Sequence, residues 1–187
     1  IAVEASLTGH LVLSTLHTNS APETVTRLLD MGMDPFNFAD SLLAVLAQRL
    51  VRRLCSGCRT QRPATEEEIE EWLADYLHVG PKDDPRFTRD AVLGGWIERY
   101  GRDGRLMHHD SPGCDQCNHT GFRGRAGLHE LMIVTRELRH LIQTGARAEE
   151  LQRRAIGEGM RTLRQDGILK VLAGATTLAE VRATSNA

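Results

Sequence analysis

Short apolar runs bounded by polar residues dominate the first part of the chain. Leu11–Leu16 is such a run, rich in β-forming residues, and the polar side chains of His10 and of His17 to Ser20 flank it. This pattern is typical of a strand buried on both faces of a parallel sheet, although periodicity alone also allows a buried helix. Because ligands bind beyond the carboxyl ends of such strands, we expect His17 at a binding edge. The alternative is that His17 only caps the strand and makes local hydrogen bonds.

Helical spacing and capping residues follow this run. Ser20 and Glu23 predict a capping box for a helix that stops near Gly32. A second helix is predicted from Asp34–Pro35, with apolar residues continuing to Leu46. The amphipathic stretch 48–54 fits either a strand or the tail of this helix.

Further along, capping residues and helical spacing predict five more helices, and glycines predict a turn into a strand. Thr65 starts one helix with an apolar stripe, which we expect to cover the neighbouring cysteine motifs, and Val92–Tyr100 is predicted as a short strand. The glycine-rich stretch 118–127 predicts a tight turn into an apolar strand over 128–134. The C-terminal helices are predicted to start at Thr135, Ala148, Thr162 and Thr177.

Length and charge narrow the class of protein. The 187 residues, 41% of them hydrophobic, are enough for one ordinary domain or for part of a domain with an added module. A net charge of −2 and an aromatic content of 4% argue against a nucleic-acid-binding surface. No apolar run is long enough for a membrane span, and no signal peptide is recognised. The chain begins with Ile1, and we expect it to be a fragment of a longer cytosolic protein.

Two C-x-x-C pairs are the strongest chemical signal. Cys55 with Cys58 and Cys114 with Cys117 are the only cysteines of the chain, and this ligand spacing predicts one four-thiolate zinc site. Four thiolates leave no open coordination position, so the zinc would be structural. A redox role for the pairs is the alternative, and a cytosolic setting argues against structural disulfides. His108 and His109 are not needed as ligands, because the cysteines already complete the site.

Arginines dominate the basic residues. Arg49, Arg52 and Arg53 form a cluster before the first cysteine, which fits either a solvated face or a contact with a neighbouring subunit or phosphate. The only two lysines, Lys82 and Lys170, do not lie in the GxxxxGK[ST] pattern of a phosphate-binding loop.

Two long segments follow the patterns TGHLVxSTLHTN, at residues 8–19, and RLLDMGxxPFxxAxSLxxVxAQRLxRxLC, at residues 27–55. They resemble the secretion ATPase superfamily of type II secretion and type IV pilus ATPases, whose histidine box is the first of these patterns. The stretch 120–130 matches TGYxGRxGIxE, with Phe122 for tyrosine and Leu128 for isoleucine. The C-terminal sequence GMRTLRQDGILKVLAGATTLAEV also resembles the family. The paired cysteines are typical of the assembly and secretion branch, whereas the retraction ATPases typically lack them.

The resemblance implies an α/β fold, namely the C-terminal part of a RecA-like P-loop NTPase core. Residues 1–54 would complete that core, with the histidine box at 8–20. Residues 55–117 would form the tetracysteine zinc module with a helical insert, and residues 118–187 a return strand and a C-terminal helical subdomain.

The resemblance also implies a role for individual residues. His10 and His17 would sense or position the terminal phosphate of ATP and the attacking water, with Thr18, Asn19 and Arg125 near the nucleotide. The Walker A and B elements, and with them ATP and magnesium binding, are expected upstream of Ile1, so the fragment alone is expected to be inactive.

Partners and location follow from the same resemblance. The intact protein is expected to be a homohexamer that powers pseudopilus or pilus assembly. It would lie in the cytoplasm at the inner membrane and associate peripherally through a platform protein and the cytoplasmic domains of the machinery. The competing interpretation is a stand-alone zinc-ribbon module that binds protein or nucleic acid.

Overall fold

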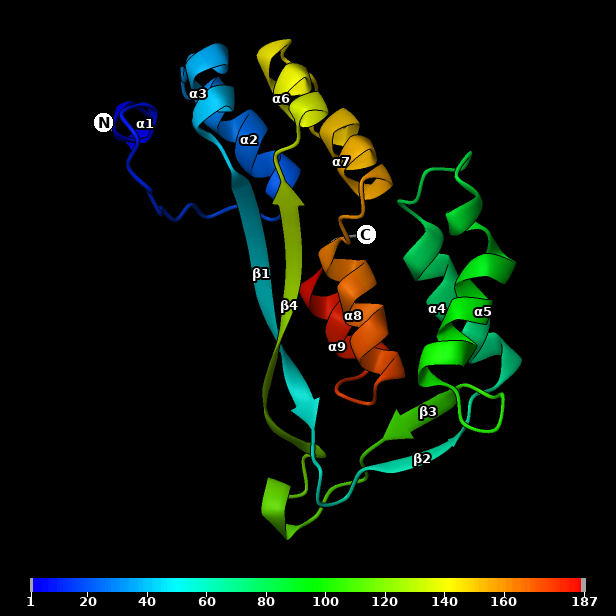
Figure 1. Ribbon diagram of the computed structural model, residues 1–187. Coiled ribbons are helices and arrows are strands. Elements are labelled where there is room, and N and C mark those ends of the chain that lie inside the picture. Colours follow the sequence, from blue (N-terminus) through cyan, green and yellow to red (C-terminus); the bar gives the residue numbers. More distant parts are fainter. Residues whose placement is uncertain (1, 186–187) are drawn as a thin grey trace. The chain divides into compact units, whose positions relative to one another are not determined.

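The computed structural model describes residues 2–185 as a mixed α/β chain, as predicted (Figure 1). By compactness, the chain divides into two units. The first takes the residues up to Ala47 together with Glu130–Thr162, and the second takes Gln48–His129 together with the residues from Leu163 onward. The elements in chain order are α1 (Ala2–Leu7), α2 (Ala21–Asp30), α3 (Pro35–Ser41), β1 (Ala44–Leu54), β2 (Thr60–Pro63), α4 (Glu66–Leu77), η1 (Pro85–Phe87), α5 (Arg89–Tyr100), β3 (Met107–Asp110), η2 (Asp115–Cys117), β4 (Phe122–Ile133), α6 (Arg136–Gln143), α7 (Ala148–Gly157), α8 (Leu163–Leu172) and α9 (Leu178–Thr184). The domain boundaries predicted after residues 54 and 117 remain a prediction.

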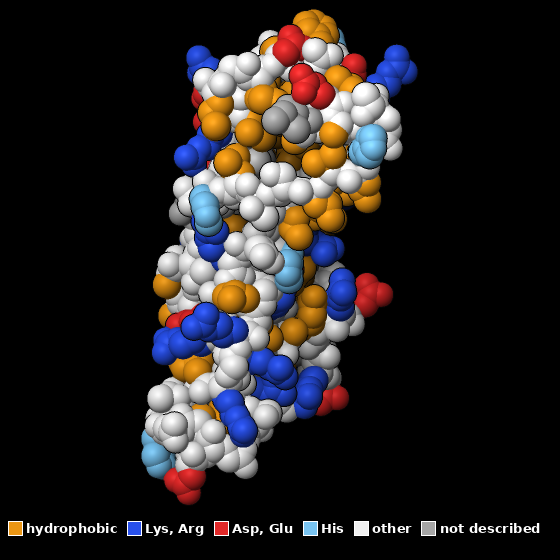
Figure 2. All heavy atoms as spheres, turned by 90° about the vertical axis from the view of Figure 1, so that its left-hand side faces the viewer, with side chains coloured by type: hydrophobic (Ala, Val, Ile, Leu, Met, Phe, Trp, Pro, Cys, Tyr) orange, Lys and Arg blue, Asp and Glu red, His pale blue; other side chains and the backbone are white. Residues whose placement is uncertain are grey.

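The first unit packs α2 and α3 with α6 and α7. Polar side chains cap three of these helices as predicted: Ser20, Asp34 and Thr135 each accept a hydrogen bond from a backbone N–H of the first turn. The buried apolar residues of this unit include Val25, Phe38, Leu138, Ile142, Leu151 and Ile156. Hydrophobic side chains are also exposed on the face that carries α1 to α3 (Figure 2). Met31 and Phe36 are among the exposed hydrophobic residues of this unit.

The second unit has one main apolar cluster. Helix α4 contributes Trp72 and Leu73 to it, and the partly buried residues of the predicted stripe pack around them. The other members come from α5, α8, α9 and the loop before β3: Val92, Trp96, Leu106, Ile168, Val171, Leu172 and Val181. The helix that starts at Thr65 was expected to cover the cysteine motifs, but its buried residues pack against α5 and the C-terminal helices.

Two two-stranded sheets complete the fold among the described residues. Strand β2 pairs antiparallel with β3, in a register that runs from Thr60 opposite Asp110 to Pro63 opposite Met107. The long strands β1 and β4 form a separate two-stranded sheet. Strand β4 confirms a strand after the second cysteine pair, but it begins at Phe122, within the stretch 118–127 that was predicted as a turn.

The predicted strand at Leu11–Leu16 is wrong for this structure. The stretch has no regular secondary structure, and its side chains are exposed, with Leu11 at 77% and Leu13 at 90%. A strand forms only where a second strand accepts and donates its backbone hydrogen bonds. Among residues 2–185, the four strands pair only as β1 with β4 and β2 with β3.

Three further local predictions need correction. Val92–Tyr100 is not a strand but most of helix α5, because Thr88 caps a helix that buries Val92 and Trp96 four residues apart. The helix from Asp34 ends at Ser41, and the residues from Ala44 onward belong to β1. The strand alternative for residues 48–54 is the correct one.

Two of the predicted capping boxes are incomplete. Ser20 and Thr177 each cap their helix as predicted. However, the Glu23 carboxylate accepts a hydrogen bond from the Asn19 N–H, and the Glu180 carboxylate binds Arg52. Of the three predicted boxes, the one formed by Thr65 and Glu68 is fully reciprocal. A helix long and apolar enough to cross a membrane is not found among the described residues.

Candidate metal centre and histidine segment

The four cysteines converge on one point of the second unit. Their sulfur atoms all lie within 4.8 Å of one another. The Sγ–Sγ distance is 4.0 Å from Cys55 to Cys114, and 3.9 Å from Cys117 both to Cys58 and to Cys114. A disulfide requires about 2.05 Å, whereas four sulfurs at about 2.3 Å from one tetrahedral zinc lie about 3.8 Å apart. The cluster can therefore hold one metal ion, and its spacing excludes disulfides.

Backbone geometry builds the second cysteine turn. Asn118 and His119 adopt left-handed conformations with φ of 51° and 57°, which turn the chain back after Cys117. Gly113 has a φ of 106°, and a Cβ there would lie 2.6 Å from the His119 carbonyl oxygen. Gly121 has a φ of 77°, and its Cβ would lie 2.3 Å from the Ser111 carbonyl oxygen. Glycine is required at both positions, because a side chain fits neither the conformation nor the space.

The two cysteine turns are joined to each other outside the sulfur cluster. The Cys55 N–H donates a hydrogen bond of 2.9 Å to the Gly121 carbonyl. The Ser111 hydroxyl lies 3.0 Å from Cys58 Sγ and 3.4 Å from the Cys55 carbonyl. Sequence reasoning missed Ser111, because it precedes the second pair without belonging to a ligand motif. These contacts tie the first cysteine pair to the residues on either side of the second pair.

The thiols differ in acidity. Burial raises the pKa of the Cys114 thiol to about 11. Burial also acts to raise the pKa of Cys117, but hydrogen bonds from the Cys114 and Gly121 backbone outweigh it and lower the pKa to about 6. Because the thiolate is the form that binds a metal, Cys117 is more ready to coordinate near neutral pH than Cys114.

His108 and His109 lie outside the cluster, as expected. His108 Nδ1 is 2.8 Å from Glu68 Oε1, and its ring stacks on Trp72. The ring of His109 lies so close to Gly174 that a Cβ there would be 2.7 Å from it. Burial lowers the pKa of His109, and the charges of Arg59 and Arg102 lower it further. Both rings therefore serve the packing of β3, and among the described residues only the four cysteines form a metal-binding group.

Local contacts hold the two ends of the histidine segment, residues 8–20. At its start, His10 Nδ1 lies 3.2 Å from Thr8 Oγ1 and 3.3 Å from the Ala5 carbonyl oxygen. At its end, the His17 carbonyl accepts a hydrogen bond of 2.7 Å from Arg27 on α2. The structure thus places His10 and His17 in separate local contacts.

The residues after His17 are anchored on α2. Thr18 Oγ1 lies 2.6 Å from Thr24 Oγ1, and Asn19 N–H donates to Glu23 at 3.1 Å. The buried Glu130 carboxylate accepts a hydrogen bond of 2.6 Å from the Ala21 N–H at the helix N-terminus. Sequence reasoning missed Glu130, which comes from the matched segment 120–130 and lies 109 residues away in sequence. Arg125 belongs to the second unit, where it is an exposed residue of β4.

Comparison with known proteins identifies the family. The family described as "Type II/IV secretion system protein" matches residues 1–183. This chain belongs to that family. It is 46% identical over 181 residues to type II secretion system protein E of Aeromonas hydrophila, covering 97% of this chain and 31% of that protein. It is 43% identical over 183 residues to the type IV pilus assembly ATPase PilB of Thermus thermophilus, covering 98% of this chain and 18% of that protein.

A further relative gives the same picture. Type II secretion system ATPase E of Vibrio cholerae is 42% identical over 181 residues, with 97% of this chain and 31% of that protein covered. The chain thus spans about a third or less of the length of these relatives. The family assignment confirms the resemblance drawn from the sequence motifs and lends no support to a stand-alone zinc-ribbon module.

Proposed function

We propose that this chain is part of a hexameric ATPase that powers type II secretion or type IV pilus assembly. The observation that carries the proposal is a match over nearly the whole chain to relatives named as such ATPases, with the histidine box at residues 8–20. In this proposal the chain completes a RecA-like core whose Walker A and B elements lie upstream. The protein would work in the cytoplasm, bound to the inner membrane through a platform protein.

His17 is the residue proposed to act nearest the reaction. Arg27 on α2 donates a hydrogen bond to the His17 carbonyl, and this bond fixes the backbone to which the imidazole is attached. A neutral imidazole there would donate a hydrogen bond to the terminal phosphate of ATP, while His10, Thr18, Asn19 and Arg125 would lie near the nucleotide. Phosphoryl transfer depends mainly on such positioning and on charge stabilisation, and magnesium would supply further charge in the intact protein.

The four cysteines are proposed to hold structural zinc. The sulfur spacing and a thiol of lowered pKa fit a tetrahedral four-thiolate site. When bound, zinc supplies a crosslink between the two cysteine turns and no catalysis, because all four coordination positions are taken by protein ligands.

ATP hydrolysis by the full-length protein tests the proposal. We expect His17→Ala to lower kcat by about a hundredfold or more, in line with the loss of one group that stabilises the transition state. A matched control is His129→Ala, since His129 is an exposed histidine of β4 outside the histidine segment. The 187-residue chain by itself should not hydrolyse ATP. Unchanged hydrolysis by the His17 variant would overturn the role of the segment, and no hydrolysis by the intact protein would overturn the ATPase proposal.

A further inference from the structure

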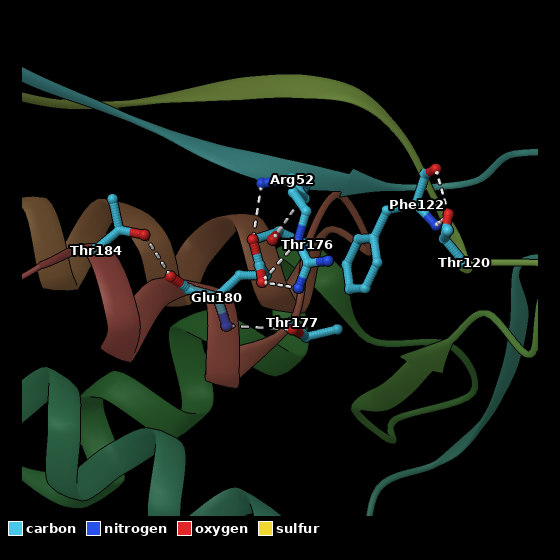
Figure 3. A network of polar contacts seen from close by, with 7 residues as sticks. All are labelled: Arg52, Thr120, Phe122, Thr176, Thr177, Glu180 and Thr184. Carbon is cyan, nitrogen blue, oxygen red and sulfur yellow. Dashed lines mark hydrogen bonds and ion pairs between the residues drawn. The ribbon is translucent and has the colours of Figure 1, made fainter. Parts of the chain in front are cut away.

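Arg52 connects the strand before the first cysteine turn to the C-terminal helix α9. Its backbone N–H donates to Glu180 Oε2 at 3.0 Å, and its guanidinium donates to Glu180 Oε1 from Nε at 3.0 Å and from Nη2 at 2.5 Å (Figure 3). Both guanidinium bonds end on the same carboxylate oxygen, while the backbone N–H binds the other oxygen. Hydrogen bonds between charged groups are stronger than those between neutral groups. Glu180 is 15% exposed, and its bonds to Arg52 lower its carboxyl pKa. The Glu180 carboxylate is thus shielded from water, whereas the Arg52 side chain is 59% exposed.

A second route joins Arg52 to the other cysteine turn. The guanidinium carbon lies 4.2 Å from the centroid of the Phe122 ring, a cation–π contact (Figure 3). The Phe122 N–H donates to Thr120 Oγ1 at 3.3 Å, and Thr120 Oγ1 donates to the Cys117 carbonyl at 2.6 Å. Arg52 therefore touches a residue that is itself fixed to a cysteine of the second pair.

The turn between α8 and α9 is bound on both sides of the first cysteine pair. Before the pair, the Leu54 N–H donates to the Ala175 carbonyl at 2.9 Å, and Thr176 Oγ1 donates to the Arg52 carbonyl at 2.7 Å. After the pair, Arg59 Nη1 donates to the Gly174 carbonyl at 2.6 Å. The segment that carries Cys55 and Cys58 and the segment that starts α9 thus share a continuous set of polar contacts.

We propose that Arg52 and Glu180 form a latch that couples metal binding at the cysteines to the docking of α9. The inference rests on the proposed metal site and adds a consequence for the C-terminal helix. A metal that fixes the two cysteine turns also fixes Leu54, Arg59 and Phe122, and these residues hold the α9 turn and Arg52. Because such coupling is reciprocal, a broken latch must weaken metal binding by the factor by which metal binding strengthens the latch.

The test compares a latch variant with a matched control on the same helix. Glu180→Gln removes the charge that binds Arg52 and leaves the Thr177 cap in place. Arg182→Gln removes a different ion pair of α9, the one from Arg182 Nε to Asp75 Oδ2 at 2.8 Å, which leads to α4 and not to the cysteines. Zinc affinity is measured by competition with a chromophoric chelator, and hydrogen exchange is measured at the amides of residues 178–184.

We expect Glu180→Gln to weaken zinc binding by about fivefold or more and Arg182→Gln by less than about twofold. In the wild-type chain, removing zinc should speed exchange in α9 by about the same factor, while exchange in α6 of the first unit stays unchanged. Equal zinc affinity for the two variants would overturn the latch. A wild-type chain that binds no zinc would overturn the metal site itself, so the two failures are distinguishable.

Discussion

The cysteine cluster and the histidine segment differ in where their support comes from. The cluster is held by contacts between residues far apart in the chain, such as the Cys55 N–H to Gly121 bond, and two of its four cysteines are buried. The histidine segment is anchored only at its ends by the helices next to it, and Leu13 between these ends is 90% exposed. A sequence motif gives a fixed site where the chain also supplies the neighbours, and this chain does so for the cysteines.

The largest expected effect comes from removing one cysteine. Cys117→Ser should reduce zinc from about one to about zero per chain, because a three-thiolate remnant binds far more weakly and metal binding is coupled to folding. Circular dichroism should then show partial unfolding. His17→Ala should leave both the metal content and the spectrum of the chain unchanged. Elemental analysis measures the metal content. Equal metal content in the two variants would contradict the assignment of the metal site to the cysteine cluster.

A second effect separates buried from exposed apolar residues. Trp72→Ala should lower the free energy of unfolding by about 3–5 kcal/mol, because Trp72 is buried in the main cluster of the second unit. Leu13→Ala in the same 187-residue chain should change it by less than about 0.5 kcal/mol, as is usual for exposed side chains. Urea unfolding measures both variants.

The effect of Leu13→Ala can also be compared between this chain and the intact protein. If the intact protein covers Leu11–Leu16 with neighbouring strands, Leu13→Ala in that protein should cost about 2–5 kcal/mol. A negligible cost in both contexts would contradict the proposal that this segment completes a RecA-like core.

Features that depend on neighbouring residues could be predicted from the sequence. The caps at Ser20, Thr65, Thr135 and Thr177 need only a side-chain oxygen and an N–H three residues on, and all four were predicted. The metal ligands could be predicted because C-x-x-C spacing fixes two ligands at a time. Periodicity failed at Val92–Tyr100, where the helical spacing of Val92 and Trp96 was the better guide.

Features that depend on distant residues could not be predicted. Ser111 beside Cys58, Glu130 at the start of α2 and the Arg52–Glu180 pair all join segments that no local pattern relates. The strand expected at Leu11–Leu16 failed for a related reason. An apolar run records that a segment is suited to burial, but whether it becomes a strand depends on a partner that the run itself does not contain.

The third prediction tests how the histidine segment is anchored. Glu130 is 2% exposed and accepts the hydrogen bond of the Ala21 N–H. Glu130→Leu should cost about 1–3 kcal/mol, because it leaves a buried donor unsatisfied at a helix N-terminus. Glu130→Gln, which keeps an acceptor oxygen, should cost less. Hydrogen exchange at the amides of residues 18–24 should increase in the leucine variant while α9 is unaffected, and an unchanged exchange pattern would contradict the anchoring role.

The smallest expected effect is a pH dependence that belongs to the second unit. Burial, together with Arg59 and Arg102, lowers the pKa of His109 below its usual value of about 6.5. The unfolded chain therefore binds the proton more readily, so the folded state should lose stability as the pH falls from above 6.5 towards the lowered pKa, with no further loss from this group below it. Urea unfolding between pH 7.5 and 5.5, with excess zinc and the metal content checked at each pH, measures the slope.

His109→Gln should flatten that slope, because glutamine does not titrate. His129→Gln is the control, since His129 is exposed and its pair with Asp166 is long, at 3.9 Å. Its slope should match that of the wild type. A wild-type slope that survives in the His109 variant would assign the pH dependence to another group, with the cysteine ligands as the first to examine. In that case, metal binding alone would distinguish the second unit from the histidine segment. A flattened slope would show that His109 on β3 contributes to the pH dependence of the stability of the second unit.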